Sequence, residues 1–174
     1  MKIMLPLRSL GRLFNKTQRN LAAAGVLAAA TIFLSLAGSA VPTQAASTLE
    51  KLVIETANGP RTYQIEVMRT EAERERGLML RPFMPADRAM LFDFGKVDKV
   101  AMWMKDTLIP LDMLFIRQDG TIARIAAMTE PMSERIIPSG EPVLAVLEIN
   151  GGQAAHFGIG EGDIVRHKLF GNGK

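Results

Sequence analysis

Cysteine is absent from the 174-residue sequence, and histidine occurs only twice. Without cysteine the chain has no disulfide framework, no thiol nucleophile, no cysteine-based zinc site and no cysteine that could carry a lipid anchor. Two histidines, His156 and His167, are too few for a three-histidine metal site, and we expect both to be solvated or hydrogen-bonded. The folded part must therefore be stabilised by an ordinary hydrophobic core.

Acidic residues are missing from the first part of the chain, where no Asp or Glu precedes Glu50. The charged residues of segment 1–20 are all basic, segment 21–36 is almost entirely apolar, and segment 37–40 consists of small residues. This order is typical of a secretory signal peptide. We expect residues 1–45 to form this signal, with cleavage after Ala45 preferred to cleavage after Ala40.

An uncleaved membrane anchor is the alternative interpretation of the same segment. Its apolar stretch is shorter than the roughly 20 residues that span a bilayer, which favours removal. In either case the positive flank stays inside the cell and the rest of the chain is exported. The predicted location is therefore periplasmic or secreted, with membrane contact only through the signal segment before cleavage.

Removal of the signal changes the charge of the protein. Five of the 21 basic residues but none of the 18 acidic ones lie in residues 1–45, which leaves a net charge of −2. Nucleic-acid binding needs a standing positive surface, so this class of partner is not expected.

Short alternating apolar and polar runs dominate residues 46–174, which we expect to form a single β domain. Glycine and proline mark short connections, and the dipeptide Asp119-Gly120 is the strongest hairpin signal. The expected fold is mostly β: a small β-sandwich or closed barrel of about eight strands with one or two short helices. The predicted strands are residues 49–56, 61–68, 89–94, 99–105, 111–117, 121–129, 143–150 and 163–170.

Two short helical segments are compatible with the sequence. Thr70 and Glu73 form the pattern of a capping box, which predicts a helix at residues 71–76. Residues 151–157 allow a second helical turn, closed by Gly158.

The most informative polar residues interrupt the apolar segment VAMWMKDTLIPLDMLFI, residues 100–116. Lys105 and Asp112 flank its central loop and can form an ion pair, while Asp106 and Thr107 satisfy amides of the loop. Such a network would lock the loop, since buried charges usually occur in pairs. The alternative is that these residues form the floor of a polar cleft.

Glu148 is the other carboxylate within an apolar strand. Asp112 and Glu148 are therefore weak candidates for the acid–base pair of an enzyme that cleaves glycans. The sequence contains no serine-hydrolase elbow and no phosphate-binding loop.

Methionine is abundant, and nine of the 11 methionines follow the signal segment. Thioether sulfur is a ligand for Cu(I), and Met102 and Met104 lie on one face of a predicted strand. Methionine also fills irregular hydrophobic cores, and the scatter of these residues favours that role. We therefore expect no metal site and no cofactor, with a soft-metal binder as a further alternative.

A family resemblance is carried by four segments: ERERGLMLRPFMPADRAMLFDF, VAMWMKDTLIPLDMLFIRQDG, VLAVLEINGG and GIGEGDIV. Together they resemble the uncharacterised protein family 0127, also called domain of unknown function 192, over residues 52–167. The resemblance implies a small β-sandwich-like fold, often behind a signal peptide, and no assigned activity. The family usually has asparagine at the position of Asp106, so a role that needs a neutral side chain there does not carry over. Its polar signature falls on Arg81, Lys105, Thr107, Asp112 and Glu148.

The sequence thus favours a non-enzymatic envelope protein. We expect it to bind a small molecule, a glycan or an envelope protein through a cleft near Arg81, Lys105 and Asp112, with Thr107 and Glu148 as further ligand-binding candidates. The competing hypothesis is a hydrolase of envelope glycans that uses Asp112 and Glu148.

Overall fold

A computed structural model describes residues 48–173. The predicted signal peptide, residues 1–45, lies outside the described residues. No helix of the described part is long and apolar enough to cross a membrane.

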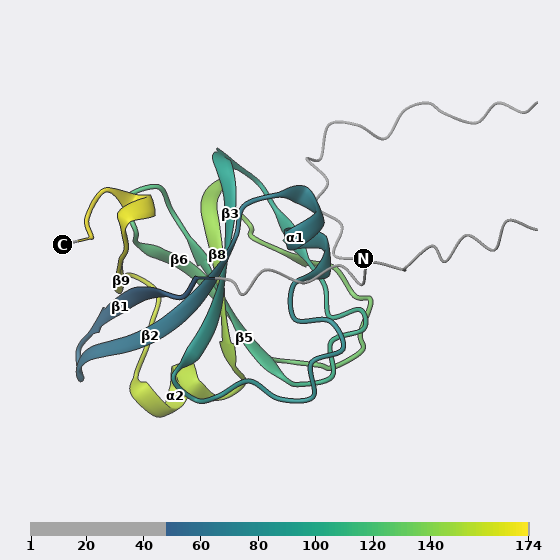
Figure 1. The fold of residues 1–174 in the computed structure, drawn as a ribbon. Coiled ribbons are helices and arrows are strands. Elements are labelled where there is room, and N and C mark those ends of the chain that lie inside the picture. The colour runs from purple at the N-terminus through teal and green to yellow at the C-terminus, as the bar shows by residue number, and fades with distance from the viewer. Residues whose placement is uncertain (1–47, 174) are drawn as a thin grey trace, which may run out of the picture. The chain divides into compact units, whose positions relative to one another are not determined.

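Most of the strands belong to one curled sheet of seven, in the order β6-β5-β8-β3-β2-β1-β9 (Figure 1). Two further short strands, β4 (Ala101–Met102) and β7 (Ile137–Pro138), form a small sheet of their own. The chain is therefore mostly β, as the sequence predicts. The strands of the large sheet are β1 Glu50–Thr56, β2 Gly59–Met68, β3 Arg88–Asp98, β5 Leu111–Ile116, β6 Ile122–Thr129, β8 Val143–Asn150 and β9 Ile164–Arg166.

Both predicted helices are present. In α1 (Glu71–Arg76) the Thr70 hydroxyl accepts a hydrogen bond from the Glu73 amide, and the Glu73 carboxylate accepts one from the Thr70 amide, which completes the capping box. Helix α1 lies in the connection between β2 and β3. These strands are parallel, so the chain must return to the starting end of the sheet, and a two-residue turn is too short for this. Helix α2 (Gln153–Phe157) follows β8.

Two strand predictions were too long. Only residues 101–102 of the segment 99–105 form a strand, because the chain then turns, with a hydrogen bond from the Thr107 amide to the Met104 carbonyl of 3.1 Å. The last predicted strand ends at Arg166. The ring of His167 then accepts a hydrogen bond from the Leu169 amide and caps a 3₁₀ helix at Lys168–Phe170.

The curled sheet closes on itself at one end, where the outer strands β6 and β9 approach each other. Thr121 and Ile164 form an antiparallel bridge. Beside it the Val165 amide donates to the Gly120 carbonyl at 2.8 Å, and the Ile122 amide donates to the Asp163 carbonyl at 2.9 Å. We call this short contact the seam. The large sheet is therefore a half-barrel and not two stacked sheets. Within the described residues, its outer strands β6 and β9 are joined only at the seam.

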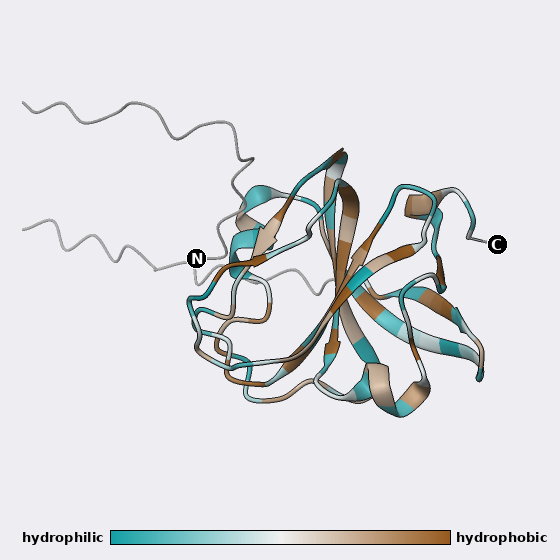
Figure 2. Cartoon of the chain, turned by 180° about the vertical axis from the view of Figure 1, so that it is seen from behind, coloured by the Kyte–Doolittle hydropathy of each residue, from teal (hydrophilic) through white to brown (hydrophobic). Residues whose placement is uncertain are grey.

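Each face of the sheet carries a hydrophobic core. The first core cluster takes buried residues from all seven strands, among them Leu52, Ile65 and Leu147, and fills the concave face. The second core cluster, with Met90, Phe92 and Phe115, lies on the other face and is covered by residues such as Leu78 and Met102. Figure 2 shows the hydrophobic colouring concentrated on the central strands. Both faces of β5 and β8 are buried, and these strands are apolar except for Asp112 in β5 and Glu148 and Asn150 in β8.

Candidate functional site

Three loops come together at one end of the structure and hold most of the polar residues singled out from the sequence. The Leu80 amide donates to the Asp106 carbonyl at 2.8 Å, and the Met132 amide donates to the Thr107 carbonyl at 3.0 Å. These bonds join the segments 77–87, 103–110 and 128–133, which gather on the side of Figure 1 that carries α1. We call them the loop end.

Lys105 and Asp112 do not form the predicted ion pair. The Lys105 ammonium lies 3.9 Å from the Glu134 carboxylate and 5.5 Å from the centre of the Trp103 ring, and it is partly exposed. Thr107 is fully buried, and its hydroxyl donates to the Lys105 carbonyl within the same turn at 3.2 Å. Thr107 thus stays within the turn but binds a carbonyl instead of the predicted loop amide, and the partner of Lys105 is Glu134 instead of Asp112.

Asp106 has a left-handed backbone, with φ of 53°. Asparagine and aspartate are the non-glycine residues that adopt this conformation most readily. The backbone at this position therefore accommodates either side chain, whatever its charge.

Asp112 is fully buried and is bound by main-chain amides instead of a cation. One carboxylate oxygen accepts hydrogen bonds from Met128 at 2.8 Å and Gly152 at 3.0 Å, and the other accepts one from Ala154 at 2.8 Å. Met128 lies where the register of β5 and β6 shifts, so its amide has no regular ladder partner. Gly152 and Ala154 belong to the start of α2, whose first amides have no partner within the helix. Asp112 therefore connects three elements.

Glu148 is also fully buried, but it lies on the opposite face of the sheet from Asp112. Side chains alternate along a strand, and Leu147 and Ile149 on either side of Glu148 belong to the first core cluster. Met113, the partner of Glu148 on β5, belongs to the second core cluster, so Asp112 next to it faces the first. The structure thus does not bring the two carboxylates together on one substrate face.

Arg81 lies on the same side of the sheet as Glu148. Its guanidinium makes two hydrogen bonds to the Glu66 carboxylate, at 2.5 and 2.8 Å. These bonds raise the pKa of Arg81 further above its high ordinary value, so it remains charged. In the register of the sheet Glu66 pairs with Met90, and Met90 pairs with Glu148. Glu66 and Glu148 thus occupy one row, two strands apart, which corresponds to about 10 Å between their backbones.

The loop end also exposes large apolar side chains, which the sequence did not indicate. Leu80 is 71% exposed, Met128 59% and Met132 52%, and all three have left-handed φ angles, of 59°, 48° and 62°. Together with Asp106 they are all the non-glycine residues of positive φ in segment 48–173. Phe83 and Leu108, from the same loops, are also exposed. We call Leu80, Phe83, Leu108, Met128 and Met132 the apolar rim.

Eight of the nine methionines of residues 48–173 belong to the core or to this rim, and Met79 is partly buried. Six of them belong to the second core cluster, where they pack with leucine and phenylalanine and fill the space between the sheet and its cover: Met68, Met84, Met90, Met102, Met104 and Met113. Within the described residues, no group of three His, Asp or Glu side chains is arranged to hold a metal ion.

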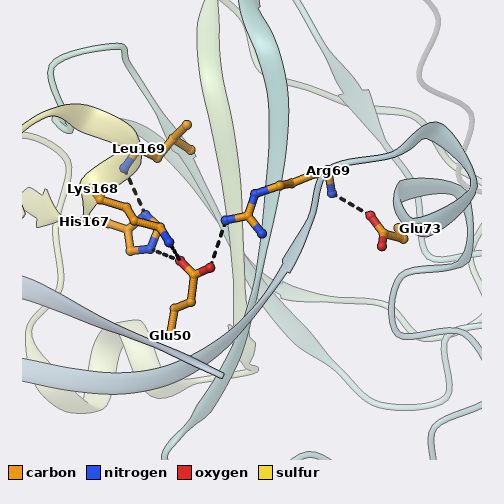
Figure 3. A network of polar contacts seen from close by, with 6 residues as sticks. All are labelled: Glu50, Arg69, Glu73, His167, Lys168 and Leu169. Carbon is orange, nitrogen blue, oxygen red and sulfur yellow. Dashed lines mark hydrogen bonds and ion pairs between the residues drawn. The ribbon is translucent and has the colours of Figure 1, made fainter. Parts of the chain in front are cut away.

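A second polar cluster lies at the other edge of the sheet, around Glu50 on β1 (Figure 3). The Glu50 carboxylate contacts three cationic or potentially cationic groups: Arg69 at 2.9 Å, His167 at 2.9 Å and Lys168 at 3.1 Å. His167 is buried, and both of its ring nitrogens are engaged, Nε2 with Glu50 and Nδ1 with the Leu169 amide. The expectation that His167 is hydrogen-bonded is therefore confirmed, and the ring has no nitrogen left for acid–base chemistry in this arrangement.

The pKa values of this cluster are shifted downward. Burial alone would raise the pKa of the Glu50 carboxyl, but the hydrogen bonds that it accepts lower the pKa from 4.5 to about 2. Burial lowers the pKa of His167, and the hydrogen bond to Glu50 offsets this only in part. The neutral form of His167 also fits the geometry, because its Nδ1 must accept the Leu169 amide.

We expect the stability of the fold to decrease in two stages as the pH falls. The contribution of His167 is complete above its ordinary pKa of 6.5 and is lost below it, and that of Glu50 is complete above 4.5 and is lost toward pH 2. Urea unfolding from pH 8 to pH 2 measures both stages. Glu50→Gln should lower the free energy of unfolding by about 1–2 kcal/mol at pH 7, and by much less near pH 2.

Glu55→Gln is the matched control for this prediction. Glu55 lies on the same strand and pairs with Arg166 at 2.9 Å, but both side chains are largely exposed. Its replacement should cost less than about 1 kcal/mol and leave the two stages unchanged. If Glu50→Gln gave the same pH profile as Glu55→Gln, the Glu50 cluster would not contribute to stability.

Comparison with known proteins gives a family and two similar structures. The family model DUF192, described as "Uncharacterized ACR", matches residues 53–167. A crystal structure of a protein from Sinorhizobium meliloti 1021, described as a candidate transcription regulator, is 43% identical with a TM-score of 0.69, over 71% of this chain and 97% of that one. A protein of unknown function from Novosphingobium aromaticivorans DSM 12444 is 38% identical with a TM-score of 0.67, over 68% of this chain and 85% of that one. No curated protein matches the chain.

Proposed function

The chain belongs to the uncharacterised DUF192 family, and from this premise we propose that it is an exported, non-enzymatic module that binds a protein of the cell envelope through its loop end. The observation that carries the proposal is the apolar rim. A large aliphatic side chain at positive φ costs on the order of 1 kcal/mol, and its exposure brings no gain from burial. Three such residues, Leu80 and Met132 in loops and Met128 near the end of β6, support a surface that is covered by a partner.

A non-enzymatic role is supported by the way in which the candidate catalytic groups are used. The carboxylate of Asp112 is bound by three main-chain amides, and Glu148 lies on the other face of the sheet. Both ring nitrogens of His167 are occupied. We do not extend the regulator description of the similar S. meliloti protein to this chain, because the net charge without the signal segment is −2.

Export is supported by the order of basic, apolar and small residues in segment 1–45. We expect the protein in envelope fractions to begin near Ala46. Mass spectrometry of the native N-terminus measures this directly. A protein that retained Met1 would contradict the proposed export and cleavage.

Because the backbone of the apolar rim is strained, we expect two substitutions there to raise the free energy of unfolding, whereas most substitutions lower it. Leu80→Asn and Met132→Asn should each raise the free energy of unfolding by about 0.5–1 kcal/mol, because asparagine tolerates a left-handed backbone. Phe83→Asn is the control, since Phe83 is 69% exposed but has no positive φ, and it should bring no gain. Thermal unfolding distinguishes the two classes.

The same variants test whether a partner protein binds at the apolar rim. With a photo-crosslinking residue at position 83, the exported protein should form one defined adduct in cells, and Leu80→Asn with Met132→Asn should abolish it while the fold becomes more stable. A crosslinker at the exposed Thr62 of β2 is the control and should not give this adduct. Adduct formation that is insensitive to the rim substitutions would contradict the proposal.

A further inference from the structure

A groove of about 490 Å³ runs along β6, between this outer strand of the large sheet and the small sheet. One wall is formed by residues 126–130 and the other by residues 135–138. We call it the β6 groove. It adjoins the apolar rim at Met128, but most of it lies outside the loop end.

The groove follows the edge of the strand and not one of its faces. Neighbouring side chains of a strand point to opposite faces, so a groove over one face is lined by every second residue. Here Ala126, Ala127, Met128 and Thr129 line it without interruption. The register shift between β5 and β6 breaks the alternation at these residues, and the groove lies along the outer edge of this irregular stretch of β6.

The first half of the same edge is already paired by the chain itself. At Ile122 the amide donates to Asp163 and the carbonyl accepts from Gly162, both at 2.9 Å. The Ile125 amide then donates to the Glu161 carboxylate at 3.3 Å. Beyond Ile125, among the described residues, no main-chain hydrogen bond joins residues 126–127 to a segment on the groove side, whereas the Met128 amide donates to the Asp112 carboxylate. An unpaired strand edge of this kind pairs with an added strand.

The opposite wall presents a second strand edge. Strand β7 pairs with β4 on one side only. On its other side the Pro138 carbonyl accepts a hydrogen bond of 2.6 Å from the Arg124 guanidinium, which reaches across from β6. The groove is thus an opening between two strand edges, and an extended chain has the shape to enter it.

The charged residues that line the groove favour an acidic ligand. Arg124 and Arg135 line it, and neither forms an ion pair within residues 48–173, whereas Glu130 is the one acidic lining residue of this part of the chain. Met128 and Ile136, each 59% exposed, offer apolar contacts beside them. We propose that the β6 groove binds an extended, acidic segment of a partner protein by strand addition to β6. This inference rests on the proposed function, since it names the segment that the partner would contribute.

Binding of defined peptides to the purified protein tests this inference. The probe is a fluorescent peptide of about eight residues that alternates Glu and Val, the length of strand that such edges accept. It should bind at least about tenfold more tightly than the same peptide with Lys in place of Glu. N-methylation of alternate amides, which removes the donors of one peptide edge, should abolish binding. Hydrogen exchange should show new protection at residues 126–127, since the amides of Ile125 and Met128 already donate to Glu161 and Asp112.

Substitutions in the protein give the matched comparison. Arg135 lies at an exposed position. Arg135→Glu should lower the affinity for the acidic peptide about tenfold and raise the affinity for the basic peptide. Lys51→Glu makes an equal change of charge at an exposed site on β1, and it should leave the affinity for both peptides unchanged. Absence of binding at millimolar peptide, equal binding of the N-methylated peptide, or a dimer that buries β6 would each overturn the inference. Loss of peptide binding in Arg135→Glu with an intact rim adduct would separate the groove from the rim, so the two proposals can fail independently.

Discussion

Asp112→Ala is expected to lower the free energy of unfolding by about 3–5 kcal/mol. The substitution removes the acceptor of three main-chain amides, those of Met128, Gly152 and Ala154. A buried amide that loses its partner costs about 1–3 kcal/mol, and these three lie where neither the sheet nor the helix supplies a replacement. Urea unfolding at pH 7 measures the loss.

Two further variants distinguish this role from an ion pair. Asp112→Asn retains one acceptor oxygen and should cost less than Asp112→Ala. Lys105→Met should change the free energy of unfolding by less than about 1 kcal/mol, because its carboxylate partner is Glu134 and the pair is exposed. A coupling energy of several kcal/mol between Lys105→Met and Asp112→Ala would contradict the amide network.

Gly120→Ala should lower the free energy of unfolding by about 2–4 kcal/mol. Gly120 has φ of 89°, and a Cβ atom there would lie 2.5 Å from the Val165 carbonyl oxygen and 2.6 Å from the Asn172 side chain. The Gly120 carbonyl also accepts the Val165 amide at the seam. The added methyl group must therefore move β9 away from the β6 side of the barrel.

Gly162→Ala provides the control for the backbone contribution alone. Gly162 has φ of 93° near the same seam, but a Cβ atom there would meet nothing within 4 Å. Its replacement should cost only about 1 kcal/mol, the strain of the left-handed conformation. Hydrogen exchange at Ile122 and Val165 should become faster in Gly120→Ala and remain nearly unchanged in Gly162→Ala. Equal effects of the two variants would show that the seam does not depend on close packing at Gly120.

The pattern of residues along the chain was sufficient to locate most elements. Alternation predicted β1, β2 and β6, apolar runs predicted β5 and β8, and the pair Thr70 and Glu73 predicted α1 with its cap. These signals are local, since they depend on neighbours within a few residues. The strand predicted at 99–105 was too long because a tertiary contact, the hydrogen bond from the Met104 amide to the Ser133 carbonyl, turns the chain after β4.

The candidate site was predicted in its composition but not in its geometry. Arg81, Lys105 and Thr107 do lie in the same set of loops, yet their partners are Glu66, Glu134 and the turn itself. The apolar rim was missed because nothing in the residue type of a leucine or methionine indicates a left-handed backbone. The Glu50 cluster was missed because its members, Glu50 and Lys168 at the extremes, are up to 118 positions apart in the chain.

By itself the sequence determined that residues 48–173 would be mostly β, because the period of apolar residues is a property of each strand alone. Only the tertiary structure decided that Asp112 and Glu148 face opposite sides of the sheet, and that Asp112 binds amides instead of Lys105. The faces depend on the register between β5 and β8, which is set by hydrogen bonds between segments distant in the chain. Alternation orders the side chains within a strand, whereas pairing decides which side chains of two strands meet.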